Sequence, residues 1–196
     1  IVYIPHFMSW VVAASIFSMI LSPTSAGLVN DVLMKLHLIT DNIYFLGDQK
    51  WWRFSYYIIN VWKDTGWGTI IFMATLAGIS PELYEAASMD GANRFQKMIY
   101  ITLPALNNTI VTVLVLNLAK VMNLFESVFV LQNDAVIKVS DVLQTYIYTQ
   151  TFNSGAIPDY GYTTAVGMFS SIISCILVLV CNRAVSYTHL TLPTIC

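Results

Sequence analysis

Long stretches without formal charge alternate with short polar segments along this chain. Asp31 is the first charged side chain, and a later uncharged stretch, Tyr160–Asn182, ends at Arg183. A helix that crosses a bilayer needs about 20 mostly apolar residues. The pattern therefore predicts an all-α membrane protein with about four transmembrane helices. We place these spans at about residues 3–22, 60–79, 104–131 and 160–182.

The composition agrees with a membrane protein and argues against a soluble domain. Of the 196 residues, 57% are hydrophobic and 10% are charged. Soluble domains carry about 25% charged residues. The mean hydropathy is +0.66. A net charge of −2 without any basic run argues against a nucleic-acid partner, and membrane lipid is the expected surrounding.

The second span has the least distinct start. Thr65–Pro81 is uncharged but short for a span, so we begin this helix near Val61. Lys63 would then extend its ammonium group to the membrane interface, where Trp62 and Trp67 suit the role of anchors.

Both ends of the sequence are expected to differ from those of the natural protein. The chain begins with Ile1 inside an apolar stretch. Val185–Thr194 reads VSYTHLTLPT, which matches a translated sequencing adaptor. We therefore interpret residues 185–196 as an artefact and residues 1–184 as the membrane domain. A genuine extended tail is the alternative.

One polar loop, Ser80–Pro104, carries strong local structure signals. Ser80 is a favourable helix cap and Pro81 fits the first helical position. Asp90-Gly91 should end this helix, because glycine readily takes the left-handed conformation found at helix ends. A second short helix is expected at Ala92–Tyr100, and Pro104 should open the third span. These signals fit both a docking knob and an ordinary connecting loop.

The exact string in this loop resembles the EAA motif of permease subunits in bacterial binding-protein-dependent ABC importers. The matching positions are Glu85-Ala86-Ala87, Asp90-Gly91-Ala92, Ile101 and Leu103-Pro104. One position departs from the pattern: Met98 stands where phenylalanine is usual, and Phe95 lies one turn earlier. Similar resemblance, to permeases of the complex-polysaccharide and oligosaccharide type, extends over most of Ile1–Arg183. It includes Pro5-His6-Phe7, Ser9-Trp10, Ser22-Pro23, Trp62-Lys63 and Gly66-Trp67-Gly68.

The resemblance implies a type I ABC importer permease (MetI-like) fold in the bacterial cytoplasmic membrane. The four expected spans would be the last ones of a longer set, with further spans before Ile1. In such importers the EAA loop is cytoplasmic and docks on a separate ATPase subunit. This implied orientation matters because the positive charges on the two sides of the spans are nearly balanced. The docking residues carried over are Glu85, Ala86, Ala87, Asp90, Gly91, Ala92, Leu103 and Pro104.

The implied function is ATP-driven uptake of a sugar, an oligosaccharide or polysaccharide fragment, by alternating access. The implied partners are the ABC ATPase, a second EAA-motif permease and an extracellular solute-binding protein. The chain is expected to be no enzyme and to hold no cofactor or metal, since ATP is used by the ATPase. It carries no Walker motif and no nucleophile–base set, and Cys175 and Cys181 lack metal-site or disulfide spacing.

The third span carries the candidate residues for the sugar pathway. A charge at the bilayer centre costs about 2.5–3.5 kcal/mol on insertion scales, so Lys120 and Glu126 should avoid lipid. With Asn117 and Asn123 they recur at every third position and would form a slowly drifting stripe on one helix. The stripe fits a sugar path or, alternatively, contacts between helices.

Two other functions are compatible with the apolar pattern. A secondary transporter would couple ions through Lys120 and Glu126 and would need no ATPase. A membrane-embedded enzyme is disfavoured because the sequence lacks a cluster of His, Asp and Glu ligands. The EAA string favours the ABC permease over both.

Overall fold

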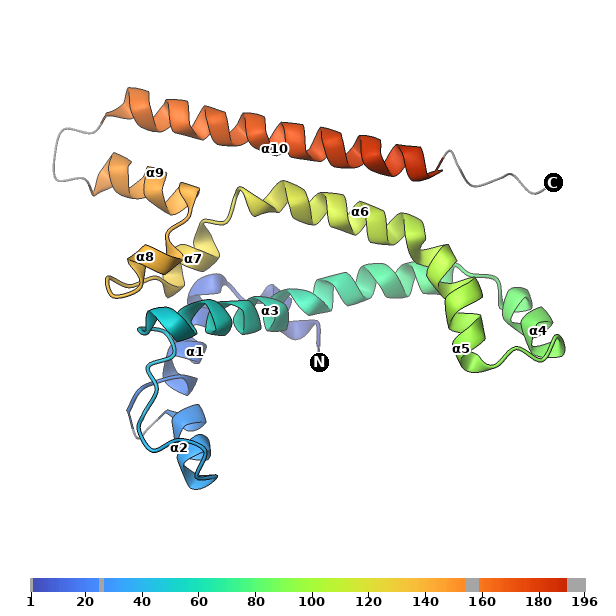
Figure 1. Cartoon of the computed structure of the whole chain (residues 1–196), viewed down its shortest axis with the longest axis horizontal. Helices are drawn as coiled ribbons and strands as arrows, with labels where there is room; N and C mark the ends of the chain where they lie inside the picture. Colours follow the sequence, from blue (N-terminus) through green and yellow to red (C-terminus); the bar gives the residue numbers. More distant parts are fainter. Residues whose placement is uncertain (1, 25–26, 154–158, 190–196) are drawn as a thin grey trace. The chain divides into compact units, whose positions relative to one another are not determined.

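In the computed structural model, every regular element among the described residues, 2–24, 27–153 and 159–189, is a helix (Figure 1). The elements before the polar loop are η1 (Ile4–Phe7), α1 (Trp10–Ile20), α2 (Leu28–Lys35) and α3 (Gln49–Ala77). The loop and the helix after it are α4 (Pro81–Met89), α5 (Arg94–Lys97), the π-helical turn η2 (Met98–Thr102) and α6 (Leu103–Val121). The remaining elements are α7 (Glu126–Leu131), α8 (Ile137–Ser140), α9 (Leu143–Phe152) and α10 (Tyr160–His189).

These helices form two compact units, and α3 and α10 contribute to both. The first unit contains the described residues up to Gly66 together with Met122–Ile172. The second contains Trp67–Val121 and the described residues from Ile173 onward. The polar loop therefore lies in the second unit.

The N-terminal half of α3, packed against α7, holds the first unit together. Trp52 and Tyr56 are buried and stacked, with ring centroids 5.1 Å apart. The Trp52 indole Nε1 donates to the Leu131 carbonyl at 3.1 Å, and the Tyr56 and Ser127 hydroxyls lie 2.9 Å apart. Because each buried polar tip has a partner, the two helices pack in one register.

α3 begins at Gln49, so the predicted helix start near Val61 is wrong. Asp48 precedes the first helical residue, and its carboxylate accepts a hydrogen bond from the Lys50 amide at 2.9 Å. This cap satisfies an amide that the first helical turn leaves without a partner. Charged and aromatic residues interrupt the apolar pattern at 49–60, which is why hydropathy alone placed the start too late.

Lys63 does not extend to a membrane interface as predicted, because its side chain is buried in the first unit. Only 6% of Lys63 is exposed. Its Nζ donates to the His6 carbonyl at 3.3 Å and lies 5.0 Å from the centre of the Trp10 ring. The neighbouring Asp64 carboxylate lies 3.7 Å from His6 Nδ1. The His6 carbonyl and the Trp10 ring, both in the N-terminal segment, thus reduce the free-energy cost of burying the Lys63 charge.

The first predicted span is divided into two elements. η1 ends at Phe7, and α1 starts at Trp10 after the Ser9 side chain accepts a hydrogen bond from the Val12 amide at 3.3 Å. The 11 residues of α1 extend about 16 Å at 1.5 Å per residue. That length is about half the thickness of a bilayer core.

Asn30 fixes the segment that joins α1 to α3. Its side chain is fully buried. Nδ2 donates to the carbonyls of Ser22 and Ile43, both at 2.9 Å, and Oδ1 accepts from the Ile43 amide at 3.0 Å. These bonds join α2, which carries Asn30, to the turn that follows α1 and to the segment that precedes α3.

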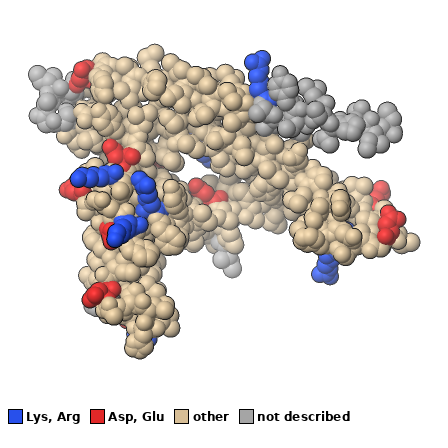
Figure 2. Space-filling model, viewed as in Figure 1, with Lys and Arg blue, Asp and Glu red and all other residues tan. Residues whose placement is uncertain are grey.

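Within the described part of the chain, two helical stretches are long and apolar enough to cross a membrane, Arg94–Val121 and Tyr160–Arg183. The second starts where the sequence predicted and continues as helix to His189, into the segment interpreted as adaptor; residues 190–196 lie outside the described part. Phe169 and Ile176 of α10 are 61% and 54% exposed. Figure 2 shows charged side chains in a few groups, separated by wide uncharged areas. Such surfaces fit a lipid environment.

The close crossing of the N-terminal segment over α3 gives a stability prediction. A Cβ atom at Gly66 would meet the Val2 carbonyl oxygen and lie 2.6 Å from Tyr3 Cα, both backbone atoms. We expect Gly66→Ala to lower the free energy of unfolding by about 1–3 kcal/mol, as overpacking does. Thermal unfolding of the purified protein in detergent measures this loss.

Gly68→Ala is the matched control, because a Cβ there meets nothing within 4 Å. Alanine favours a helix over glycine by about 1 kcal/mol, so this variant should match or exceed the wild type. Equal melting temperatures for both variants would contradict the close crossing.

Candidate functional site

The first arm of the polar loop is α4, and it ends in a bend built around Gly91. Gly91 has a φ of 79°, the left-handed conformation predicted for it. Its amide donates to the Ser88 carbonyl at 3.1 Å, and the Ala92 amide donates to the Ala87 carbonyl at 2.9 Å. This pair of bonds is a Schellman motif, which satisfies the last carbonyls of the helix. At the other end Ser80 has an extended cap conformation, but its side chain does not make the predicted cap hydrogen bond.

The second arm starts with a capping box that was not predicted. The Asn93 side chain accepts from the Gln96 amide at 2.9 Å, and the Gln96 side chain accepts from the Asn93 amide at 2.8 Å. The spacing Asn-x-x-Gln in the sequence was a signal for it. The arm continues without interruption into α6, so Pro104 does not open a new helix.

A π-helical turn lets the helix continue past Pro104. The turn occupies Met98–Thr102, and the Leu103 amide donates to the Met98 carbonyl, five residues earlier. Proline lacks an amide hydrogen and normally clashes with the preceding helical turn. The wider π turn directly before Pro104 relieves that conflict, as π-bulges do inside α-helices.

Two side-chain contacts brace the two arms against each other. The Tyr84 and Thr102 hydroxyls lie 2.9 Å apart. Lys97 Nζ donates to the Ser88 hydroxyl at 2.5 Å. Because each contact joins α4 to the helix that leads into α6, the bend is set by both backbone and side chains.

The braced bend leaves most of the EAA-motif residues exposed. Glu85, Ala86, Asp90, Gly91, Leu103 and Pro104 are exposed, and Ala87 and Ala92 are half-buried. Large apolar side chains are exposed beside them, with Met89 at 89% and Phe95 at 65%. Met98, at the unusual position, is 42% exposed. An exposed apolar surface on a rigid support is typical of a protein-binding element.

The predicted polar stripe on the third span is interrupted, and the predicted helix from 104 to 131 is wrong. α6 ends at Val121, and α7 begins at Glu126 after an irregular turn. Lys120 lies in the last turn of α6 and Glu126 in the first turn of α7. These are the helix ends that the helix dipole favours for a cation and an anion. No glycine or proline lies at this break, so the sequence pattern predicted one continuous helix across it.

The four pathway candidates therefore occupy different surroundings. Asn117 lines a shallow groove on the second unit with otherwise apolar residues, including Phe72 and Leu114. Asn123 belongs to the first unit, where Gln144 Nε2 of α9 donates to its Oδ1 at 3.4 Å. Lys120 and Glu126 are exposed. The structure does not place the four residues on one helical face.

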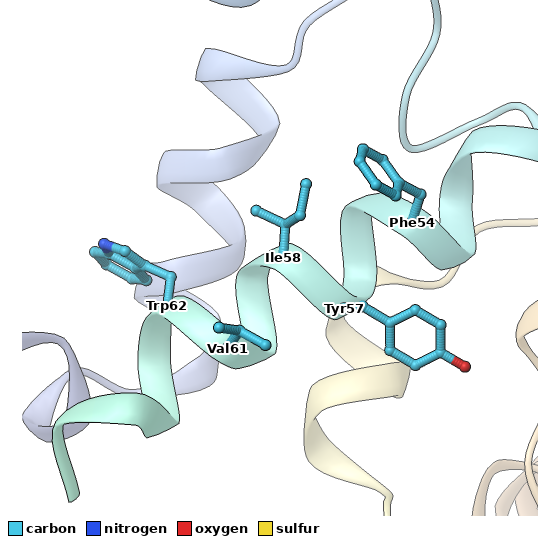
Figure 3. Close-up of a pocket in the computed structure, with 5 residues that line it drawn as sticks. All are labelled: Phe54, Tyr57, Ile58, Val61 and Trp62. Carbon is cyan, nitrogen blue, oxygen red and sulfur yellow. The ribbon is translucent and has the colours of Figure 1, made fainter. Parts of the chain in front are cut away.

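A further groove lies on α3 and is almost entirely apolar. It is lined by Phe54, Tyr57, Ile58, Val61 and Trp62, whose side chains Figure 3 shows along one stretch of the helix. Such a lining suits lipid or a neighbouring helix and offers few polar groups to a solute. Among the described residues, no three His, Cys, Asp or Glu side chains gather as a metal site.

Comparisons with known proteins identify the family. Residues 1–188 match the family described as binding-protein-dependent transport system inner membrane component. The chain is 41% identical over 182 residues to protein LplB of Bacillus subtilis (strain 168), covering 92% of this chain and 55% of that protein. It is 39% identical over 184 residues to the polygalacturonan/rhamnogalacturonan transport system permease protein YteP of the same organism, covering 93% and 56%. The chain thus spans about half the length of these curated relatives.

A solved structure shows the same fold. In the crystal structure of a bacterial ABC transporter involved in the import of the acidic polysaccharide alginate, one chain is 36% identical to this one. The TM-score is 0.88, and the match covers 95% of this chain and 64% of that chain. The all-α, MetI-like permease fold predicted from the sequence is therefore confirmed. The chain belongs to the family of inner membrane components of binding-protein-dependent transport systems.

Proposed function

We propose that this chain is a permease subunit of an ATP-driven sugar importer and forms part of the translocation pathway. The observation that carries the proposal is the loop at 80–104. In a chain of this family, a left-handed glycine and two side-chain braces hold the EAA-motif residues on an exposed bend. A rigid, exposed bend suits docking on a second protein better than a plain connection between helices does.

The proposed orientation places this loop in the cytoplasm, where the ATPase subunit is available. In this orientation the chain would cross the inner membrane in the regions of α1, α3, α6 and α10. The segments 30–57 and 132–159 would then face outward, toward a solute-binding protein. A second permease of the same family would complete the pathway, and the alginate transporter relative was also solved in complex with alginate pentasaccharide-bound periplasmic protein.

The proposed mechanism couples motion of the ATPase to the spans through the loop. Glu85 offers a carboxylate to a basic group of the ATPase, while the small Ala86 and Ala87 side chains allow close approach. Leu103 and Pro104 are the first residues of α6, which follows the second arm of the loop without a break. A braced loop moves as a rigid body, so displacement at Gly91 is transmitted to α6 as alternating access requires.

The proposed cargo is an oligosaccharide or polysaccharide fragment. The relatives named above include a permease for polygalacturonan and rhamnogalacturonan and a transporter for alginate. The chain itself acts as no enzyme and needs no cofactor, since ATP hydrolysis belongs to the partner subunit. The secondary-transporter alternative is not supported: the family match points to an ATP-driven system, and Lys120 and Glu126 lie on separate helices.

The docking role predicts a loss of uptake from substitutions in the loop. We expect Glu85→Lys to reduce ATP-driven saccharide uptake at least tenfold, because reversing one charge of a buried interfacial pair costs about 2–5 kcal/mol. Gly91→Val should act similarly, since a β-branched residue at φ 79° is strained. Uptake of radiolabelled oligosaccharide into proteoliposomes and co-purification of the ATPase are the measurements.

Glu82→Lys is the matched control, because Glu82 is also an exposed acid on α4 but lies outside the motif. It should leave uptake within about twofold of wild type, as surface charge changes usually do. Normal uptake and normal ATPase assembly in both loop variants would refute the docking role.

The pathway proposal assigns sugar contacts to Asn117, Lys120, Asn123 and Glu126. A neutral hydrogen bond contributes about 0.5–1.5 kcal/mol, so Asn123→Leu should raise the apparent KM for uptake roughly 2- to 12-fold. Glu126→Gln replaces a charged acceptor by a neutral amide and should also raise the apparent KM, because hydrogen bonds to charged groups are the stronger ones. Asn107→Leu, an exposed amide earlier on α6, is the control. If KM and substrate preference stay unchanged in both variants, these residues serve helix contacts instead.

A further inference from the structure

The first unit contains a partly enclosed hollow that the proposed pathway residues do not use. Its volume is about 240 Å³. Its walls come from the C-terminal end of α1, the turn after it, the segment before α3 and the end of α7. Ligand pockets for whole drug-sized molecules measure about 300–1,000 Å³. The hollow therefore suits one ring-sized unit of a larger molecule.

Three polar groups around this hollow make no hydrogen bond to the described part of the chain. They are the Ser18 hydroxyl, the Tyr44 hydroxyl and the Gln132 amide, each from a different segment. Ser18 and Tyr44 are exposed and Gln132 is half-buried. An apolar wall from Leu21, Leu46 and Val130 lies among them. A few unengaged polar groups on an apolar lining are the usual composition of a small-molecule site.

Hydrogen bonds within the chain hold the segments that line the hollow in place without a ligand. Asn133 Nδ2 donates to the Leu46 carbonyl at 2.8 Å and ties the end of α7 to the segment before α3. Asn30 ties the turn at Ser22 to Ile43 through bonds of 2.9 Å. A preformed site loses less conformational entropy on binding than one that must be ordered first.

Tyr44 is positioned by a glycine. A Cβ atom at Gly47 would lie 2.6 Å from the Tyr44 Cζ atom, so a side chain at position 47 would displace the ring from its present place. The tyrosine side chain nevertheless remains 50% exposed. A partly exposed aromatic ring can stack against the apolar face of another ring.

We infer that this hollow is a saccharide subsite that holds one neutral glycosyl unit of the transported chain. The C–H face of a pyranose packs on Tyr44, while its hydroxyls exchange hydrogen bonds with Gln132 and Ser18. None of the described residues that line the hollow is charged. A uronate unit would call for arginine or lysine opposite its carboxylate, so a neutral unit fits better.

The inference rests on the proposed function, because the proposed orientation puts these segments on the outer side of the membrane. There the hollow would receive one end of a saccharide before the pathway opens. It assigns saccharide contacts to Ser18, Tyr44 and Gln132, which lie apart from the EAA loop and from the four pathway candidates.

The test is saccharide binding by the importer complex that contains this chain, held in nanodiscs without nucleotide or solute-binding protein. Saturation-transfer NMR with xylotriose as the neutral probe and trigalacturonate as the acidic probe reports binding. We expect xylotriose to bind and trigalacturonate to bind at least fivefold more weakly. Tyr44→Ala and Gln132→Leu should each weaken xylotriose binding roughly 5- to 10-fold, the loss of one stacking contact or hydrogen bond.

Gly47→Ala tests the site without removing a contact group, since it displaces the Tyr44 ring and should weaken binding by a similar factor. Gly68→Ala, where the added methyl meets nothing within 4 Å, should bind as the wild type does. Size-exclusion elution of the complex with its ATPase and its thermal unfolding, measured on the same preparations, show that each variant is folded and assembled.

The outcomes separate the subsite from the proposed function. Xylotriose binding that is unchanged in Tyr44→Ala and Gln132→Leu, in complexes that still import, overturns the subsite alone. Equal affinity for trigalacturonate overturns its preference for a neutral unit. A wild-type complex that binds xylotriose through Tyr44 but imports no saccharide with ATP contradicts the proposed function and leaves the subsite standing.

Discussion

The whole fold depends on satisfying polar groups within an apolar chain. In a lipid environment an amide or carbonyl without a partner costs several kcal/mol, so spanning segments become helices whose backbone bonds are internal. The same requirement governs the polar side chains of this protein. Thr75, Thr112 and Ser171 each donate to the carbonyl four residues earlier, at 3.2, 2.8 and 3.0 Å. Such bonds let hydroxyls sit on apolar helices at little cost.

Where the helices end, the same constraint selects specific side chains. Asp48, Ser9 and Asn93 each accept a hydrogen bond from an amide in the first turn of the helix that follows. Asn30 forms hydrogen bonds with backbone groups of two segments, the turn at Ser22 and the segment at Ile43, through one buried side chain. These polar contacts give the first unit its defined turns and, with them, the walls of the hollow described above.

The loop at 80–104 uses polar contacts for a different purpose. Most of its residues are exposed, so water could satisfy them without any folded loop. Instead the Schellman bonds at Gly91 and the contacts Tyr84–Thr102 and Lys97–Ser88 hold one bend. These bonds make the bend more rigid than a plain connection between two helices requires. A rigid bend can transmit force, and this property supports its proposed role in coupling. The π turn before Pro104 serves the same end, because it keeps the loop and α6 in one continuous helix.

The sequence by itself determined the helical class, the membrane character and, through the EAA-like string, the permease family. These follow from local signals: the lengths of apolar runs, the conformational freedom of Gly91 and the exact spacing of the EAA residues. Tertiary structure alone decided where helices break without glycine or proline, as between Val121 and Glu126. It also decided that Lys63 is buried, since the groups that receive its charge, His6 and Trp10, lie more than 50 residues away in the chain. A hydropathy scale assigns every lysine the same polar value. The free-energy cost of burying a lysine depends instead on the partner groups near its ammonium group, and only the folded chain brings those groups together.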